Sequence, residues 1–247
     1  MRNESLENLV GVTKEILAAK YSGAEFAFLA GSIIRGEGTK YSDLDIVVIF
    51  ADLPNAFRES FHFEGFPVET FVHTPETLNY FFERDSKEQN PSLAMMVTEG
   101  VVVPTENDLS GKLKGLAAEV VENPPTITTE EIDALRYGIT NLVDDIRDPR
   151  SKEALIGAAI GLYPTLAEFY LRTNGHWAAR RKAIPKYLNQ ADSEFGKRFC
   201  EGFEKLFSLG KTDKIIKLAE EVLEPFGGLY FEGARVDAPS DWRKPIK

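Results

Sequence analysis

The chain has 247 residues, of which 43% are hydrophobic and 28% charged, and this ordinary globular composition argues against a disordered protein. A net charge of −10 makes long nucleic acid an unlikely partner, because such binding relies on a large positive field, and it favours a cationic small molecule. A single cysteine, Cys200, excludes an intrachain disulfide. Neither a signal-like N-terminus nor a membrane-spanning apolar run is evident, so a soluble cytoplasmic protein is expected.

The first half of the chain alternates short apolar runs with helical patterns. Residues 5–20 carry apolar side chains at helical spacing after Ser5, a favourable N-cap residue. Apolar runs rich in β-branched and aromatic residues predict strands that end at Gly31, begin at Asp43 and cover PVETFVH. Further along, the patterns predict a helix over 75–83, a short strand over 99–105 and a polar helix near 108–122. These elements indicate a mixed sheet with helices.

The pattern changes after the segment ENPPTIT at 122–128, because its paired prolines cannot continue a helix. Beyond it, long segments carry apolar residues at helical spacing, and each ends at or near a glycine or proline. We therefore expect an α+β chain with a mixed-sheet domain over residues 1–122, a helical bundle of four or five helices over 129–235 and a C-terminal tail over 236–247.

Two carboxylates mark the start of the second predicted strand. In Asp43-Leu44-Asp45 the strand period of two sends both aspartates to one face, while Leu44 points to the other. Neighbouring carboxylates repel each other unless a cation lies between them. Mg²⁺ prefers oxygen ligands, and it can be bound by protein carboxylates and substrate phosphates at the same time. The pair therefore predicts a magnesium site at the mouth of the sheet.

A turn suited to phosphate binding precedes this pair. Gly31 has no side chain to obstruct a triphosphate, Ser32 supplies a hydroxyl, and the turn that follows supplies backbone N–H groups. Arg35 and Lys40 lie in the same loop and are placed to offset phosphate charge. A Gly-Ser turn or an Asp-x-Asp pair alone is a common surface feature, whereas the two in this order favour phosphoryl or nucleotidyl transfer.

The stretch FAFLAGSIIRGEGTKYSDLDIVVIF resembles the Gly-Ser, then Asp-x-Asp signature of the DNA polymerase β-like nucleotidyltransferase superfamily. The layout, with helices after the sheet, resembles the aminoglycoside and lincosamide nucleotidyltransferase branch. The resemblance implies transfer of a nucleoside monophosphate, AMP from ATP by default, to an acceptor hydroxyl with two Mg²⁺ ions. It implies that Asp43 and Asp45 bind metal and that Gly31 and Ser32 contact the triphosphate. Arg35, from its charge and its place in the loop, is a further candidate nucleotide contact.

The resemblance also implies roles outside this stretch. In the superfamily a third carboxylate lies on a neighbouring strand, and Glu69 in FPVETFVH holds the matching place as third metal ligand or general base, with Glu64 and Glu76 as competitors. Similar enzymes carry a nucleotide-binding cation after a tryptophan in the bundle, and Lys182 is our candidate for it. The alternative is that the basic stretch around Lys182 is a solvated helix face.

The acceptor is the least determined partner. Asp144 and Asp145, near the end of the first bundle helix, are candidates to bind an amine-bearing acceptor or to replace Glu69 as the base; the alternative is that they are ordinary exposed carboxylates. We expect a small hydroxylated acceptor, with an antibiotic as the class that the resemblance implies. Adenylylation of a protein and a toxin–antitoxin-type nucleotidyltransferase partner stay open, as do the donor base and the oligomeric state.

Overall fold

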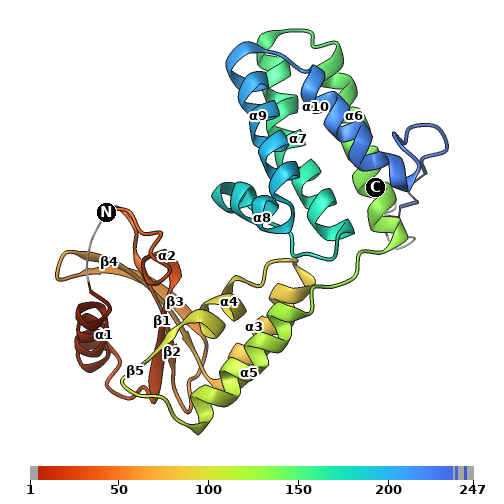
Figure 1. Cartoon of the computed structure of the whole chain (residues 1–247). Helices are drawn as coiled ribbons and strands as arrows, with labels where there is room; N and C mark the ends of the chain where they lie inside the picture. The colour runs from red at the N-terminus through yellow and green to blue at the C-terminus, as the bar shows by residue number, and fades with distance from the viewer. Residues whose placement is uncertain (1–4, 236, 239–241, 244–247) are drawn as a thin grey trace, which may run out of the picture. The chain divides into compact units, whose positions relative to one another are not determined.

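The computed structural model describes residues 5–235, 237–238 and 242–243 of the chain, so most of the predicted tail over 236–247 lies outside the described residues. The chain divides into two compact units, Met1–Pro125 and Thr126–Lys247 (Figure 1). The first unit holds a mixed sheet with helices and the second is helical, which confirms the α+β prediction.

Within the described residues the first unit contains five strands in one mixed sheet of order β3-β4-β2-β1-β5, in which only β2 and β4 are parallel. Its elements are, in chain order, α1 (Leu6–Lys20), β1 (Phe26–Ala30), α2 (Gly31–Ile34), β2 (Leu44–Ile49), β3 (Phe57–Phe63), β4 (Phe66–His73), α3 (Pro75–Lys87), α4 (Ser92–Glu99), β5 (Val101–Val103) and α5 (Asp108–Glu122).

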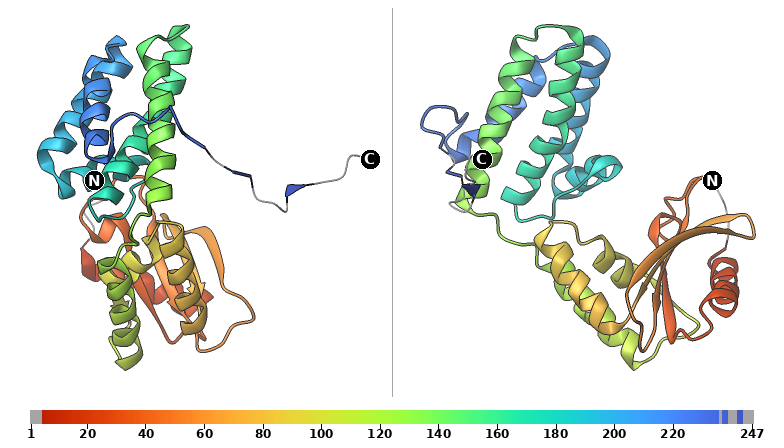
Figure 2. Two further views of the ribbon diagram at one scale, coloured as in Figure 1. Left: turned by 90° about the vertical axis from the view of Figure 1, so that its right-hand side faces the viewer. Right: turned by 180° about the vertical axis from the view of Figure 1, so that it is seen from behind.

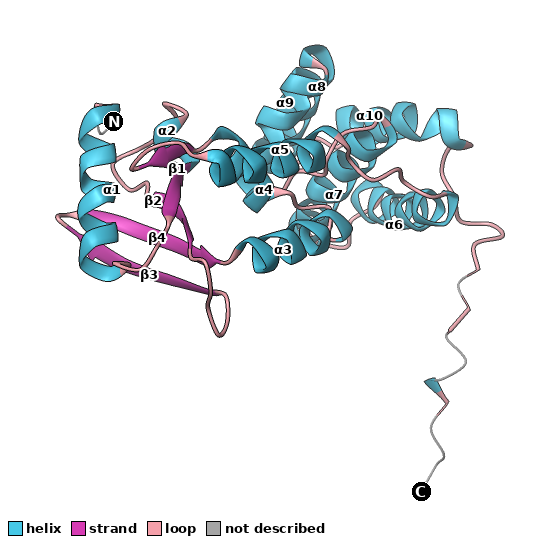
Figure 3. Cartoon of the chain, turned by 90° about the horizontal axis from the view of Figure 1, so that it is seen from below, coloured by secondary structure: helices cyan, strands magenta, loops and turns pink. Residues whose placement is uncertain are grey.

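Helices cover both faces of this sheet. Helix α1 lies on one side, and α3, α4 and α5 lie on the other (Figure 3). Strand β2 serves both layers, because Leu44, Ile46 and Val48 enter the core beneath α1 while Val47 and Ile49 enter the core beneath α3–α5. The odd-numbered side chains of β2 therefore share the face that α3–α5 cover.

Two elements of this unit are not predicted from the sequence, β3 and α4. Strand β3 has the composition FRESFHF, in which exposed and half-buried positions alternate along an edge of the sheet. It forms a hairpin with β4 through Glu64 and Gly65, which both have positive φ as tight hairpin turns require. Helix α4 is short and follows Pro91. The predicted N-cap is confirmed, since the Ser5 side chain accepts a hydrogen bond from the backbone of Asn8.

The second unit is a helical bundle whose long helices run side by side in both views of Figure 2. Its elements are α6 (Thr129–Arg147), α7 (Lys152–Thr173), the 3₁₀ turn Arg181–Ala183, α8 (Ile184–Ala191), α9 (Ser193–Leu209), α10 (Asp213–Leu223) and the 3₁₀ turn Glu224–Phe226. Every α-helix of this unit contributes to one apolar core, rich in aromatic side chains such as Phe169, Phe199 and Phe203.

Helix α7 is long and apolar enough to cross a membrane when only length and mean hydropathy are considered. In the bundle it instead supplies core side chains, among them Leu162, Leu166 and Phe169, which are fully buried. Apolar composition follows from a central position in a bundle as readily as from contact with lipid.

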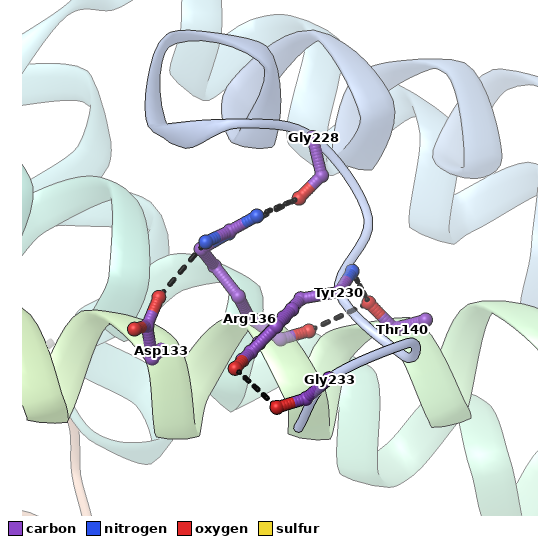
Figure 4. A network of polar contacts seen from close by, with 6 residues as sticks. All are labelled: Asp133, Arg136, Thr140, Gly228, Tyr230 and Gly233. Atoms are coloured by element: carbon purple, nitrogen blue, oxygen red, sulfur yellow. Dashed lines mark hydrogen bonds and ion pairs between the residues drawn. The ribbon is translucent and has the colours of Figure 1, made fainter. Parts of the chain in front are cut away.

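A polar network fastens the segment after α10 to helix α6 (Figure 4). The buried guanidinium of Arg136 donates to the Gly228 carbonyl oxygen from Nε at 3.1 Å and from Nη2 at 3.0 Å, and it pairs with Asp133 at 2.8 Å. The Tyr230 backbone N–H donates to the Thr140 hydroxyl at 2.8 Å, and the Tyr230 ring lies under the Arg136 guanidinium. These contacts give a buried cation a carboxylate partner and a carbonyl acceptor, which offset the cost of its burial.

Candidate functional site

The turn between β1 and β2 brings Gly31 against Asp45. Strand β1 ends at Ala30, whose register partner on β2 is Asp45, and α2 begins at the next residue. Gly31 is buried and has φ of +86°, a backbone conformation that residues with a side chain rarely adopt. A Cβ at this position would lie 2.8 Å from Cγ of Asp45 and closer still to Oδ2, so the aspartate side chain requires a glycine there.

Strand register places Glu69 beside Asp45. The two residues are partners across the parallel pair β2–β4, and partners in register project to the same face. Asp43 precedes β2 directly and lies two residues before Asp45. All three side chains are partly exposed, and each offers a carboxylate oxygen within 4.8 Å of the others.

These three carboxylates fit a divalent cation. Mg²⁺ holds oxygen ligands at about 2.0–2.1 Å, so two oxygens on one ion are at most about 4.2 Å apart. Because the three oxygens lie within 4.8 Å of one another, movements of their side chains could bring them to one ion. Three negative charges at this separation repel one another, and a bound cation would relieve that repulsion. The donor set, made only of oxygens, matches Mg²⁺ rather than a metal that prefers sulfur or imidazole.

Strand β3 adds two contacts to Glu69. The Arg58 guanidinium forms an ion pair and hydrogen bond with Oε1 of Glu69, and the Ser60 hydroxyl donates to the same oxygen at 3.3 Å. Neither residue is a candidate from the sequence, because the sequence pattern does not predict the strand that carries them. The signal that would have found them is the alternation of Phe57, Phe61 and Phe63 with polar residues along this segment.

The other sequence candidates of the first unit lie in different surroundings. Arg35, at the end of α2, pairs with Glu37 at 3.0 Å and with Glu99 at the end of α4. Although burial opposes it, the hydrogen bonds and charges of these two glutamates raise the pKa of Arg35. Its positive charge is thus already compensated. Lys40 is exposed and lies over the ring of Tyr41 at 4.8 Å.

The competitors of Glu69 stand apart from the carboxylate cluster. Glu64 is exposed in the β3–β4 turn. Glu76 is exposed in the first turn of α3, where its own backbone N–H and the Thr74 hydroxyl lower its pKa by hydrogen bonding. The cluster of three that could hold a metal contains neither of them.

The remaining candidates belong to the second unit. Asp144 and Asp145 are exposed near the end of α6, and Asp144 accepts a hydrogen bond from Arg147 at 2.7 Å. Among the described residues no hydrogen bond or ion pair engages the Asp145 side chain. Lys182 is exposed in the 3₁₀ turn Arg181–Ala183, which precedes α8. Their suggested roles stay predictions.

A comparison with known protein families points to the same part of the chain. The family model described as nucleotidyltransferase domain matches residues 12–98, a range that includes β1, β2, β4 and all three carboxylates. No curated protein matches the chain. Among solved structures, a nucleotidyltransferase-like protein from Exiguobacterium sibiricum is similar at 16% sequence identity and a TM-score of 0.44, covering 88% of this chain and 73% of that one.

Proposed function

We propose that this chain moves AMP from ATP to a hydroxyl of a small molecule with the aid of Mg²⁺. The chain carries a nucleotidyltransferase domain of the polymerase β-like superfamily and is a nucleotidyl-transferring enzyme. The observation that carries the proposal is the convergence of Asp43, Asp45 and Glu69 beside a glycine that tolerates no side chain. Carboxylates gathered beside a turn with free backbone N–H groups are the arrangement that this chemistry requires.

In this proposal Asp43, Asp45 and Glu69 hold the metal. Two Mg²⁺ ions, when bound, would neutralise charge on the attacking and leaving oxygens. The chain's own part is to hold the three carboxylates close together, which the β2–β4 register supports for Asp45 and Glu69. The acceptor oxygen attacks the α-phosphorus, the bond to the bridging oxygen of the β-phosphate breaks, and pyrophosphate leaves. The acceptor proton passes to a carboxylate, for which Glu69 and the α6 aspartates are the candidates.

Gly31 and Ser32 are proposed to contact the triphosphate. Helix α2 begins after Ala30 without a side-chain cap, so its first N–H groups have no acceptor within the helix. A phosphate oxygen is a suitable acceptor for such groups. The half-buried Ser32 adds a hydroxyl from the same turn. Arg35 could join only by leaving Glu37 or Glu99.

The second half of the chain is proposed to serve the acceptor. We assign nucleotide chemistry to a domain over residues 1–122 and acceptor binding to a domain over 129–235. Asp145, exposed and without a partner among the described residues, is suited to an ammonium group, and the net charge of −10 favours a cationic acceptor. Lys182 is proposed as a further nucleotide contact. A cytoplasmic location would supply ATP and Mg²⁺.

A screen with labelled nucleotide tests this function. The full chain is incubated with Mg²⁺, ATP labelled at the α-phosphate and a panel of aminoglycosides, lincosamides and hydroxylated metabolites, and pyrophosphate release and labelled product are measured. We expect label on one small acceptor, lost when EDTA is added. Label that appears only on proteins added to the reaction would contradict the small-molecule acceptor and favour protein adenylylation.

A further inference from the structure

Glu69 receives two donors on a single oxygen. Arg58 and Ser60, both on β3, hydrogen bond to Oε1, and among the described residues no hydrogen bond is made to Oε2. Register explains the convergence: Ser60 is the direct partner of Glu69, and Arg58 is the partner of Phe71, two residues further along β4. Diagonal neighbours on one sheet face are within reach of a long side chain such as arginine.

The Arg58 side chain is itself held in place. Its guanidinium lies over the ring of Phe71, 5.0 Å from the centroid, which is favourable cation–π geometry. It therefore has a support on β4 as well as its partner Glu69, although 60% of its side chain is exposed. An arginine that is supported in this way loses less freedom when it binds a carboxylate than one that extends into solvent.

We propose that Arg58 is a positioning residue that, with Ser60, fixes the Glu69 carboxylate by one oxygen and leaves the other for the metal. This inference rests on the metal centre of the proposed function and goes beyond it, since it assigns β3 to the construction of that centre. Metal-binding carboxylates are generally oriented by hydrogen bonds from residues that do not touch the metal, and loss of such a partner weakens metal affinity about 10- to 100-fold.

The opposite role for Arg58 would be competition, with the guanidinium occupying Glu69 until a metal displaces it. The geometry favours positioning, because the three carboxylates already lie within 4.8 Å of one another while the Arg58 pair is formed. Both donors also engage the same oxygen, so binding at Oε2 does not require the pair to break. The large exposure of Arg58 means that water screens its charge from a metal.

Binding of Mn²⁺ to the full chain without nucleotide separates these roles, measured by electron paramagnetic resonance of the free ion. Arg58→Met keeps an apolar chain over Phe71 but removes charge and donors, and Arg58→Lys keeps the charge. Arg198→Met is the matched control, because it removes an exposed arginine–glutamate pair, with Glu221, from the second unit. Circular dichroism in EDTA verifies that each variant is folded.

We expect Arg58→Met to raise the Mn²⁺ dissociation constant about 10- to 100-fold, Arg58→Lys to restore part of the affinity, and Arg198→Met to bind as the wild type does. Equal or tighter binding by Arg58→Met would overturn the positioning role. Asp45→Asn separates this failure from that of the proposed function: if the wild type and Asp45→Asn bind Mn²⁺ alike, or neither binds, the metal centre itself is refuted together with the inference.

Discussion

The side chain of Asp45 occupies the space that a Cβ on Gly31 would need. The contact joins the two motifs of the site, since Gly31 directly follows β1 and Asp45 lies on the neighbouring strand β2. A buried glycine with φ of +86° is thus a condition for the position of a carboxylate.

Replacement of Gly31 by alanine should damage the site more than the fold. The positive φ alone costs about 1–2 kcal/mol for a residue with a side chain, and the new methyl group must also displace the Asp45 carboxylate. Gly36→Ala is the matched control, because Gly36 has φ of +72° with open space around its would-be Cβ. We expect a larger loss of stability in thermal unfolding for Gly31→Ala than for Gly36→Ala, and a loss of Mn²⁺ affinity only in Gly31→Ala. Equal Mn²⁺ affinity in the two variants would disprove the contact's importance.

Neutralising a carboxylate of the cluster should abolish transfer without harming the fold. Asp43→Asn keeps the side-chain size but removes a negative charge from a group of three that repel one another. We expect turnover to fall by about three orders of magnitude or more, and the melting temperature in EDTA to be equal to or above that of the wild type. A variant that retains about a tenth of wild-type turnover at saturating Mg²⁺ would show that Asp43 is not a ligand.

Glu69→Gln should lower the rate constant far more than it weakens ATP binding, as is expected of a base or a third ligand. The control is Glu64→Gln, which removes an exposed carboxylate from the β3–β4 turn of the same hairpin. Steady-state kinetics with varied ATP separate the two parameters. If Glu69→Gln is nearly neutral while Asp145→Asn is inactive, the base belongs to the second unit.

The two α6 aspartates should differ in their effect on acceptor binding. Asp144 is partly neutralised by Arg147 at 2.7 Å, whereas Asp145 has no partner among the described residues. For a cationic acceptor we expect Asp145→Asn to raise the acceptor KM about tenfold, Asp144→Asn to raise it less, and neither to change the KM for ATP. Added salt should weaken the same acceptor. A KM that responds to neither substitution would indicate a neutral acceptor such as a lincosamide.

Acidic pH should lower the folding stability of the first unit through His73. Burial, and after it the positive charge of Arg84, lower the pKa of this histidine to about 4 from 6.5. Between these values the unfolded chain binds a proton that the folded chain does not, so stability is complete above about pH 6.5 and falls by about 3 kcal/mol towards pH 4. Urea unfolding followed by circular dichroism measures this slope. His73→Gln should reduce the slope, and the exposed His62→Gln should leave it unchanged; an unchanged slope in His73→Gln would refute the assignment.

The sequence is sufficient to predict the parts of the site whose geometry is local. The two-residue period of a strand puts Asp43 and Asp45 on one side, and Gly31 marks the end of an apolar run. The position of Glu69 beside Asp45 depends instead on which strands are neighbours and in what register, and only the resemblance to a known superfamily supplied it. Pairing of β2 with β4 joins residues separated by the whole of β3, which no local pattern specifies.

Arg58 and Ser60 escaped prediction for a related reason. Strand β3 lies at the edge of the sheet, and its polar residues read as a loop when the segment is judged by hydrophobicity alone. The sequence also explains the glycine at position 31 only in part, because its contact with Asp45 depends on antiparallel pairing of β1 with β2. In both cases the role of a residue depends on which strands pair, and the local sequence pattern does not indicate that role.

The most direct test of the carboxylate cluster is the binding of a nonhydrolysable ATP analogue with and without Mg²⁺, because it needs no acceptor. Titration calorimetry is carried out on the wild type and on the Asp43→Asn, Asp45→Asn double variant, each in Mg²⁺ and in EDTA. We expect Mg²⁺ to tighten analogue binding at least about tenfold in the wild type and to have no such effect in the double variant. Equal dependence on Mg²⁺ in the two proteins, or none in either, would contradict a metal-assisted nucleotidyl transfer centre at Asp43, Asp45 and Glu69.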